Sequence, residues 1–154
     1  MAYARCSSTG VRSRVDVAEA PVGSIGRGLL VLLCAVKGDD EQDLDYIVKK
    51  ISQLRIFEDD DHKMNRSVLD VGGEVLVVSQ FTLAAQTRKG NRPSFDGAEA
   101  PERAMLLCEE AVARLRACGL TVKTGIFGAT MQVSLVNDGP VTVILDSAGP
   151  AAAV

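Results

Sequence analysis

The sequence predicts a single mixed α/β domain with a β-rich core and two main helices. Its 154 residues are enough to bury one hydrophobic core and are few for two. Hydrophobic residues make up 47% of the chain and charged residues 24%, the balance of an ordinary globular protein. Apolar, β-branched runs outnumber the segments with helical spacing. We expect the domain to span residues 1–147 and residues 148–154 to form a flexible tail.

The first strands are predicted in the N-terminal quarter of the chain. Residues 11–17 alternate between valine or serine and charged side chains, as a half-buried strand does. A continuous apolar run over residues 28–36 is bounded by glycines, which is typical of a strand buried on both faces. This second run is expected to form the centre of the sheet.

Two segments carry the spacing of helices that pack with one face on a sheet. Over residues 41–54 apolar side chains recur every three or four positions, with acidic residues early and basic residues late, as the helix dipole favours. The second segment, 101–118, starts at Pro101 and is stopped by Gly119. We expect both helices on one side of the sheet.

The remaining β segments surround polar motifs. The run EVLVVSQFTL over residues 74–83 ends in polar side chains, and shorter strands are predicted at 121–124, 131–136 and 141–146. The last two flank Asn-Asp-Gly-Pro, a turn signal in which Pro140 removes a backbone N–H where a strand begins. The charged run over 58–63 is predicted to be a solvated turn, because its carboxylates lack the spacing of a calcium loop.

Charge and cysteine content narrow the classes of partner. The formal net charge is −3, so binding of a nucleic acid would require a local basic patch. The loop with Arg88, Lys89 and Arg92 is the candidate for this patch. Aromatic residues amount to 4%, which disfavours base stacking. Four cysteines without CxxC spacing fit a reducing, cytoplasmic location. The longest apolar run is too short to span a bilayer, so no membrane association is expected.

A single histidine limits the catalytic chemistry. His62 stands in the acidic segment, where a catalytic or zinc-binding role is disfavoured, and no nucleotide-binding fingerprint is present. We therefore expect neither a metal nor a cofactor. Neutral polar side chains at strand ends remain, and such groups can orient a substrate or stabilise an oxyanion. They are Ser79, Gln80, Thr82, Asn137 and Thr142. In the alternative interpretation, the first three merely end a strand whose Phe81 lies in the core.

Two of these motifs, SQFTL over residues 79–83 and NDGPVT over 137–142, resemble the signatures of the D-aminoacyl-tRNA deacylases. The resemblance extends from about residue 15 to 146 and includes GSIGRGLLVLL, TRKGNRPSF and FGATMQVSLV. It implies a three-layer β/β/α fold built as a symmetric homodimer. It also implies hydrolysis of the ester between a D-amino acid and the 3′ end of a tRNA, with L-aminoacyl esters spared. Aminoacyl-tRNA is then the expected partner, and no DNA is expected.

The resemblance further implies roles for individual residues. Ser79, Gln80, Phe81 and Thr82 surround the ester, with backbone amides near Phe81 and Thr82 as oxyanion donors. Water assisted by the tRNA 2′-OH is favoured as the attacking group over Thr82, because no neighbouring base could activate that hydroxyl. Gly139 and Pro140, joined by a cis peptide bond, project from one subunit into the active site of the other, supported by Asn137 and Thr142.

Binding roles follow in the same way. Phe127 and Met131 match positions that line the adenosine pocket, although ordinary core packing explains them equally well. Arg88, Lys89 and Arg92 are candidates for phosphate contacts, which position a tRNA without reading its sequence. A rigid Gly-Pro wall beside Cα would exclude an L side chain, and it would not exclude glycine, which has none.

The chain departs from the family at its N-terminus. Family members usually carry a Gln-Arg pair in a first strand of the form VVQRV, and the arginine braces the Gly-Pro loop. Here residues 6–10 read CSSTG, so we expect a misformed first strand and weakened activity. A smaller departure is Gln86, where aspartate is common. The alternatives to an active deacylase are therefore an impaired dimeric tRNA-binding protein and a silent structural dimer.

Overall fold

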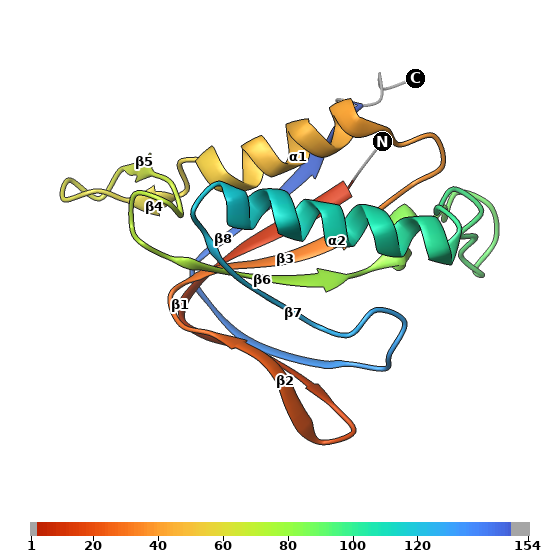
Figure 1. Cartoon of the computed structure of the whole chain (residues 1–154), viewed down its shortest axis with the longest axis horizontal. Coiled ribbons are helices and arrows are strands. Elements are labelled where there is room, and N and C mark those ends of the chain that lie inside the picture. The colour runs from red at the N-terminus through yellow and green to blue at the C-terminus, as the bar shows by residue number, and fades with distance from the viewer. Residues whose placement is uncertain (1–2, 149–154) are drawn as a thin grey trace.

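The computed structural model of the chain describes residues 3–148, so residues 149–154 of the predicted tail lie outside its described part. Figure 1 shows the course of the chain. The strands are β1 (Tyr3–Val17), β2 (Ala20–Ile25), β3 (Gly28–Cys34), β4 (Phe57–Glu58), β5 (Met64–Arg66), β6 (Glu74–Ser79), β7 (Thr121–Thr124) and β8 (Gln132–Asp146). The helices are α1 (Glu41–Gln53), the 3₁₀ turn η1 (Phe81–Ala84) and α2 (Pro101–Ala117).

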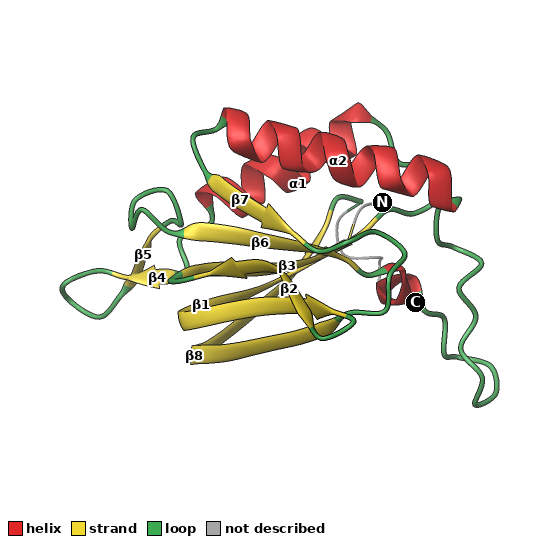
Figure 2. Cartoon of the chain, turned by 60° about the horizontal axis from the view of Figure 1, so that its bottom comes forward, coloured by secondary structure: helices red, strands yellow, loops and turns green. Residues whose placement is uncertain are grey.

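The elements form three layers, as the family resemblance implied. The main sheet has the order β2-β1-β3-β6-β7, and β8 pairs with β1. The long β1 belongs to two layers, because its N-terminal half pairs with β3 and its C-terminal half pairs with β2. Figure 2 shows α1 and α2 together over one face of the sheet, and β1 and β8 continue from this sheet into the layer farthest from the helices, where β2 pairs with β1.

Alternation along β3 and β6 produces two hydrophobic cores. Leu29 and Val31 of β3 pack with Val75 and Val77 of β6 under the helices. Their neighbours in sequence, which are Leu30, Leu76 and Val78, join Val15 and Ile25 in a second core between the two β layers. Because successive side chains of a strand point to opposite faces, a strand between two cores must be apolar throughout. The continuous run at residues 28–36 therefore has the buried position that was predicted.

Both predicted helices are confirmed, within a residue at each end. α1 begins after Asp40, whose carboxylate accepts hydrogen bonds from the amides of Gln42 and Asp43, while the Asp43 side chain bonds back to Asp40. α2 begins at Pro101, which suits the first helical position because it needs no amide hydrogen bond there. Within residues 3–148, neither helix combines the length and the apolar character needed to cross a membrane.

The N-terminal half of β1 differs from the sequence-based expectation. The strand starts at Tyr3 rather than at residue 11, and residues 6–9 pair with β3 through partners such as Cys6 with Val31. The prediction of a misformed first strand is thus wrong for the backbone, since the ladder is made of main-chain groups that any non-proline residue supplies. β2 was not predicted, because four of its six residues are exposed and it contains Pro21.

The end of the chain also differs. The strands predicted at residues 131–136 and 141–146 are one strand, β8, interrupted by a bulge that is described below. The charged run is a turn between β4 and β5, where the His62 ring is hydrogen-bonded to Glu58 at 3.0 Å and both side chains are exposed. This agrees with the prediction of a solvated turn.

The close approach of β3 to β6 requires glycine at residue 28. The two strands run parallel, with Gly28 opposite Glu74, and a Cβ atom at residue 28 would lie 1.8 Å from the Glu74 carbonyl oxygen. We predict that Gly28→Ala lowers the free energy of unfolding by about 2 to 3 kcal/mol, because backbone must move to relieve the overlap. Urea denaturation measures the loss. Gly26→Ala is the matched control, since its Cβ would meet Glu74 at an ordinary 3.7 Å. Equal stability of the two variants would contradict the argument.

Candidate active site

The ladder between β1 and β8 is interrupted at the NDGPVT motif. Thr9 is paired with Asn137, and Ser7 is paired with Thr142. Between these two pairs the step is two residues along β1 and five residues along β8. The additional residues of β8 have no partner position on β1, so they bulge out of the sheet. Pro140 therefore stands where no ladder amide is needed, which explains a proline inside a strand.

Side chains close the base of this bulge. The Asn137 amide Nδ2 donates to the Thr142 hydroxyl at 3.0 Å, which joins its two ends. Gly139 has a φ of 138°, a conformation that favours glycine. Asp138, Gly139 and Pro140 are exposed at the tip. The structure thus brings Asn137 and Thr142 together at the base of the bulge that carries the Gly-Pro pair.

The peptide bond before Pro140 corrects one expectation. Residues 3–148 contain no cis peptide bond, so Gly139 and Pro140 are joined in trans and not in cis. Trans is the more stable form of an X–Pro bond by roughly 0.5 to 1 kcal/mol when packing does not select the other.

A cavity of about 480 Å³ opens at the carboxyl ends of β3 and β6. It brings together Ser79, Gln80 and Phe81 from one motif with Phe127 and Met131 from the connection between β7 and β8. Its other walls are Leu33, Cys34 and Ala35 after β3, and Pro101, Ala104 and Cys108 of α2. Thr82 stands one residue beyond this lining. No residue from 137 to 142 lines the cavity in the described part of the chain.

The SQFT motif is held as a strand end followed by a tight turn. The Gln80 amide donates to the Leu33 carbonyl oxygen at 2.7 Å, and the 3₁₀ turn η1 begins at Phe81. The first amides of such a turn have no partner within it. The Gln80 side-chain amide donates to the Thr82 hydroxyl. Phe81 is 58% exposed and meets Phe95 edge-on with ring centroids 5.2 Å apart, so the interpretation that placed Phe81 in the core is wrong.

The sequence left two roles open for Phe127 and Met131, the cavity wall and the core, and Met131 has both. Both line the cavity, and Met131 also packs against the second core. A Cβ at Gly125 would lie 2.5 Å from the Met131 sulfur, so glycine there leaves room for the thioether. Met131 is thus both a core residue and part of the cavity wall.

The three basic residues lie outside the cavity. Arg88, Lys89 and Arg92 are exposed on a loop whose ends are joined by two hydrogen bonds between the backbones of Gln86 and Ser94, at 2.8 and 3.1 Å. Because these bonds are made by main-chain atoms, the departure at Gln86 does not disturb them. Phe95, next to Ser94, contacts Phe81, which places the base of the basic loop beside the mouth of the cavity.

The cavity wall contains two thiols of low acidity. Burial raises the pKa of Cys34, whose Sγ lies within hydrogen-bonding distance of the carbonyl oxygens of Ala35, at 3.4 Å, and Phe81, at 3.6 Å. Burial, and then the charges of Cys34 and Glu109, raise the pKa of Cys108 to about 11. A thiol nucleophile needs the opposite shift. Neither cysteine is therefore prepared for nucleophilic catalysis.

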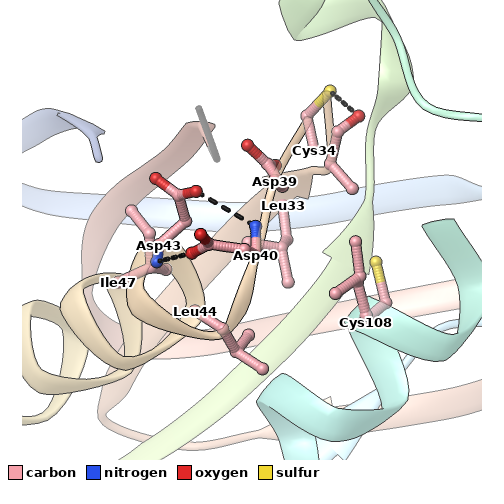
Figure 3. A pocket seen from close by; sticks show the side chains of 10 residues that line it. Leu33, Cys34, Asp39, Asp40, Asp43, Leu44, Ile47 and Cys108 are labelled. Carbon is pink, nitrogen blue, oxygen red and sulfur yellow. Dashed lines mark hydrogen bonds between the residues drawn. The ribbon is translucent and has the colours of Figure 1, made fainter. Parts of the chain in front are cut away.

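A smaller hollow behind Cys34 is drawn in Figure 3. It measures about 20 Å³, which is room for about one water molecule. Its acidic side chains have structural partners: Asp43 accepts from the Asp40 amide at 3.1 Å, and Asp39 accepts from the Val36 amide at 2.9 Å. These carboxylates hold the start of α1, so this hollow is not a second active site.

The residues after β3 and at the start of α2 were not predicted as part of the site. They carry no polar motif, and they meet Ser79 only because β3 and β6 are parallel neighbours. A sequence signal existed: two fully apolar strands, each followed by a helix, indicate a parallel pair whose carboxyl ends share an edge. No pattern identified Cys108, whose place depends on the packing of α2.

The fold and the cavity define a class of protein: a three-layer β/β/α domain whose site offers neutral polar groups and backbone amides. The chain belongs to the D-Tyr-tRNA(Tyr) deacylase family, whose model matches residues 8–146, and thus to the hydrolases that act on aminoacyl-tRNA. Proteins named D-aminoacyl-tRNA deacylase are similar throughout. That of Paracoccus denitrificans is 58% identical over 137 residues, 89% of this chain and 92% of the relative. That of Desulfitobacterium hafniense is 57% identical over 88% of this chain and 91% of the relative.

Solved structures share this fold. The "c-Myc DNA Unwinding Element Binding Protein" superimposes with a TM-score of 0.88 at 40% identity, covering 97% of this chain and 99% of that one. A structure described as that of "a probable eukaryotic D-amino acid tRNA deacylase" has a TM-score of 0.80 at 17% identity, covering 94% and 99%, and supports the fold alone. The predicted family, fold and enzyme class are confirmed.

The raised pKa of Cys108 predicts slow alkylation of its thiol. With a pKa of about 11, roughly one Cys108 thiol in a thousand is ionised near pH 8. We predict that iodoacetamide alkylates the exposed Cys118 well before Cys108 in the native protein, and that urea abolishes the difference. Peptide mass spectrometry measures both rates. Faster labelling of Cys108 would show that the cavity wall holds an activated thiolate and would contradict the apolar wall described here.

Proposed function

We propose that this chain hydrolyses the ester bond of D-aminoacyl-tRNA, releasing the D-amino acid and free tRNA, and that it accepts glycyl-tRNA as well. L-aminoacyl esters are rejected by Gly139 and Pro140 of a second copy of the chain. The observation that carries this proposal is that the Gly-Pro bulge is clamped by Asn137 and Thr142 yet absent from the lining of its own cavity. A bulge with a fixed base that does not line the cavity of its own chain can serve the cavity of a second copy.

Exposed apolar side chains on both sides of the bulge support a homodimer. β8 forms an edge of the sheet, and Leu135, Val136 and Ile144 are 41%, 56% and 71% exposed. An edge strand with an apolar row is a surface that another chain can cover. Pairing two copies through β8 would bury these side chains and carry each bulge toward the other copy.

Steric exclusion explains how such a bulge would select chirality. D- and L-amino acids exchange the side chain and the hydrogen at Cα, so a backbone wall on one side of Cα clashes with one enantiomer only. Rejection of this kind needs a wall that does not yield. The hydrogen bond between Asn137 and Thr142 provides stiffness at the base of the bulge. Glycine has no side chain on either side, so it would pass.

For the hydrolytic step, the residues favour attack by water. The Thr82 hydroxyl accepts a hydrogen bond from the Gln80 side-chain amide, and an amide is not a base that could activate it. Amides of Phe81 and Thr82 at the start of η1 are suited to stabilise the oxyanion that forms on the ester carbonyl. The 2′-OH of the terminal ribose then assists the water, so the tRNA supplies polar chemistry that the protein lacks.

The cavity and the basic loop would bind different parts of the tRNA. Phe127 and Met131 would hold the terminal adenosine against the apolar wall. Arg88, Lys89 and Arg92 would contact phosphates near the mouth, where Phe95 meets Phe81. A tRNA substrate agrees with the predicted cytoplasmic location, which stays a prediction.

A second candidate function is tRNA binding without turnover. The departure at residues 6–10 favours it, because the Gln-Arg pair expected beside the Gly-Pro loop is missing. DNA binding, which the name of the structural relative states for that protein, is less suited to a chain with a net charge of −3 and a single short basic loop. Release of amino acid separates an enzyme from a binder.

The proposal predicts a defined pattern of release. Purified protein should free D-tyrosine from D-Tyr-tRNA and leave L-Tyr-tRNA intact, as thin-layer chromatography of the two reactions would show. Pro140→Ala should lower the ratio of D to L rates by at least about tenfold, since each ~1.4 kcal/mol of lost exclusion is a factor of ten.

Pro21→Ala, at an exposed position of β2, is the control and should keep the ratio. A folded protein that retains tRNA without releasing D-tyrosine would favour the second candidate. Unchanged selectivity of Pro140→Ala would refute the role of the bulge.

A further inference from the structure

A second cavity adjoins the candidate active site. It measures about 250 Å³ and lies between α2 and the ends of β6 and β7. Ser79, Cys108 and Phe127 line both cavities, so the two hollows share one wall. Nothing in the proposed hydrolysis uses the second cavity. Its size suits a single ring more than a complete ligand, because pockets for whole ligands begin near ~300 Å³.

One face of α2 gives this cavity its chemistry. Met105, Glu109, Val112 and Arg116 follow one another at helical spacing and line it together. Met105 and Val112 offer apolar surface, and Glu109 and Arg116 bring one carboxylate and one guanidinium to the rim. The cavity can therefore hold a flat ring against Met105 and Val112. Glu109 can accept a hydrogen bond from that ring, and Arg116 can pair with an anion beside it.

The two charged side chains have defined positions. The Arg116 guanidinium donates to the Val122 carbonyl oxygen at 2.9 Å, which holds it near the start of β7 and leaves further N–H donors for a phosphate. Glu109 lies close enough to Cys108 that its charge, after burial and Cys34, contributes to the raised pKa of that thiol. Glu109 is exposed and forms part of the lining of the second cavity.

We propose that the second cavity binds the cytidine that precedes the terminal adenosine of the tRNA, with Glu109 accepting a hydrogen bond from the cytosine N4 amino group. This inference rests on the proposed function. All tRNAs end in CCA, so an adenosine in the first cavity carries a cytidine at the next position. Cytosine presents an N4 donor where uracil presents an O4 acceptor, and a carboxylate accepts from the former and repels the latter. Arg116 would contact the phosphate between the two nucleosides.

Changing one base of the tRNA tests this assignment. Fluorescence anisotropy gives the Kd of the protein for uncharged tRNA ending in CCA and in CUA. We expect the CCA end to bind about fivefold more tightly, the effect of one hydrogen bond with a charged acceptor at a partly exposed site. In Glu109→Gln the preference should vanish or invert, because the new amide can donate to uracil O4. Glu102→Gln removes the same charge from the exposed first turn of α2 and should keep the preference.

Three results would overturn the inference. The unmodified chain could bind both ends equally, or Glu109→Gln could keep the full preference for CCA. Glu109→Gln could also alter the ratio of D-Tyr to D-Ala release while the preference for CCA stays, which would place the amino-acid side chain in the cavity. Failure of the proposed function gives a different result. The protein then releases no D-tyrosine from a D-Tyr-tRNA that ends in CCA, whether or not it binds CCA more tightly than CUA. Circular dichroism of each variant shows that it is folded.

Discussion

Main-chain hydrogen bonds between β1 and β8 hold the Gly-Pro bulge in register, because the residues at which this ladder is interrupted decide where the bulge begins and ends. The register changes between Thr9 and Ser7 of β1, and there residues 137–142 leave the sheet. Asn137 and Thr142 then join the two ends of the excursion. A bulge that starts and ends in a paired strand has less freedom than a loop of equal length, so it can present Gly139 and Pro140 as a rigid surface.

The cavity depends on a second backbone constraint, the close parallel pairing of β3 and β6. Gly28 allows the strands to start together, and the shared register brings the residues after Leu33 beside Ser79 at the other end. The hydrogen bond from Gln80 to Leu33 fixes the point at which β6 becomes η1. Two apolar cores hold these strands from both faces. Catalysis with neutral groups and backbone amides needs this kind of support, since accurate positioning replaces strong acids and bases.

Elements that depend on local interactions could be predicted from the sequence, whereas those that depend on tertiary contacts could not. The helices at residues 41–53 and 101–117 and the buried strands β3 and β6 depend on local periodicity, and they were predicted closely. The N-terminal half of β1 has no apolar alternation and becomes a strand through its neighbours β3 and β8. The motifs identified Ser79, Gln80 and Phe81, whereas Cys34, Ala104 and Cys108 reach the cavity through tertiary packing. The exposure of Phe81 could not be predicted either, because it depends on where the 3₁₀ turn begins.

The central claim is that the bulge of one copy serves the cavity of another, and mixed dimers test it most directly. Ala129→Trp, whose indole would fill the cavity, gives a copy with an intact bulge and a closed site. Pro140→Ala gives a copy with an open site and an altered bulge. When Pro140→Ala chains are refolded with a large excess of Ala129→Trp chains, each open site meets an intact bulge. The account predicts that release of L-tyrosine from L-Tyr-tRNA falls while release of D-tyrosine continues. Release of L-tyrosine at the undiminished rate of the Pro140→Ala chains alone would contradict it.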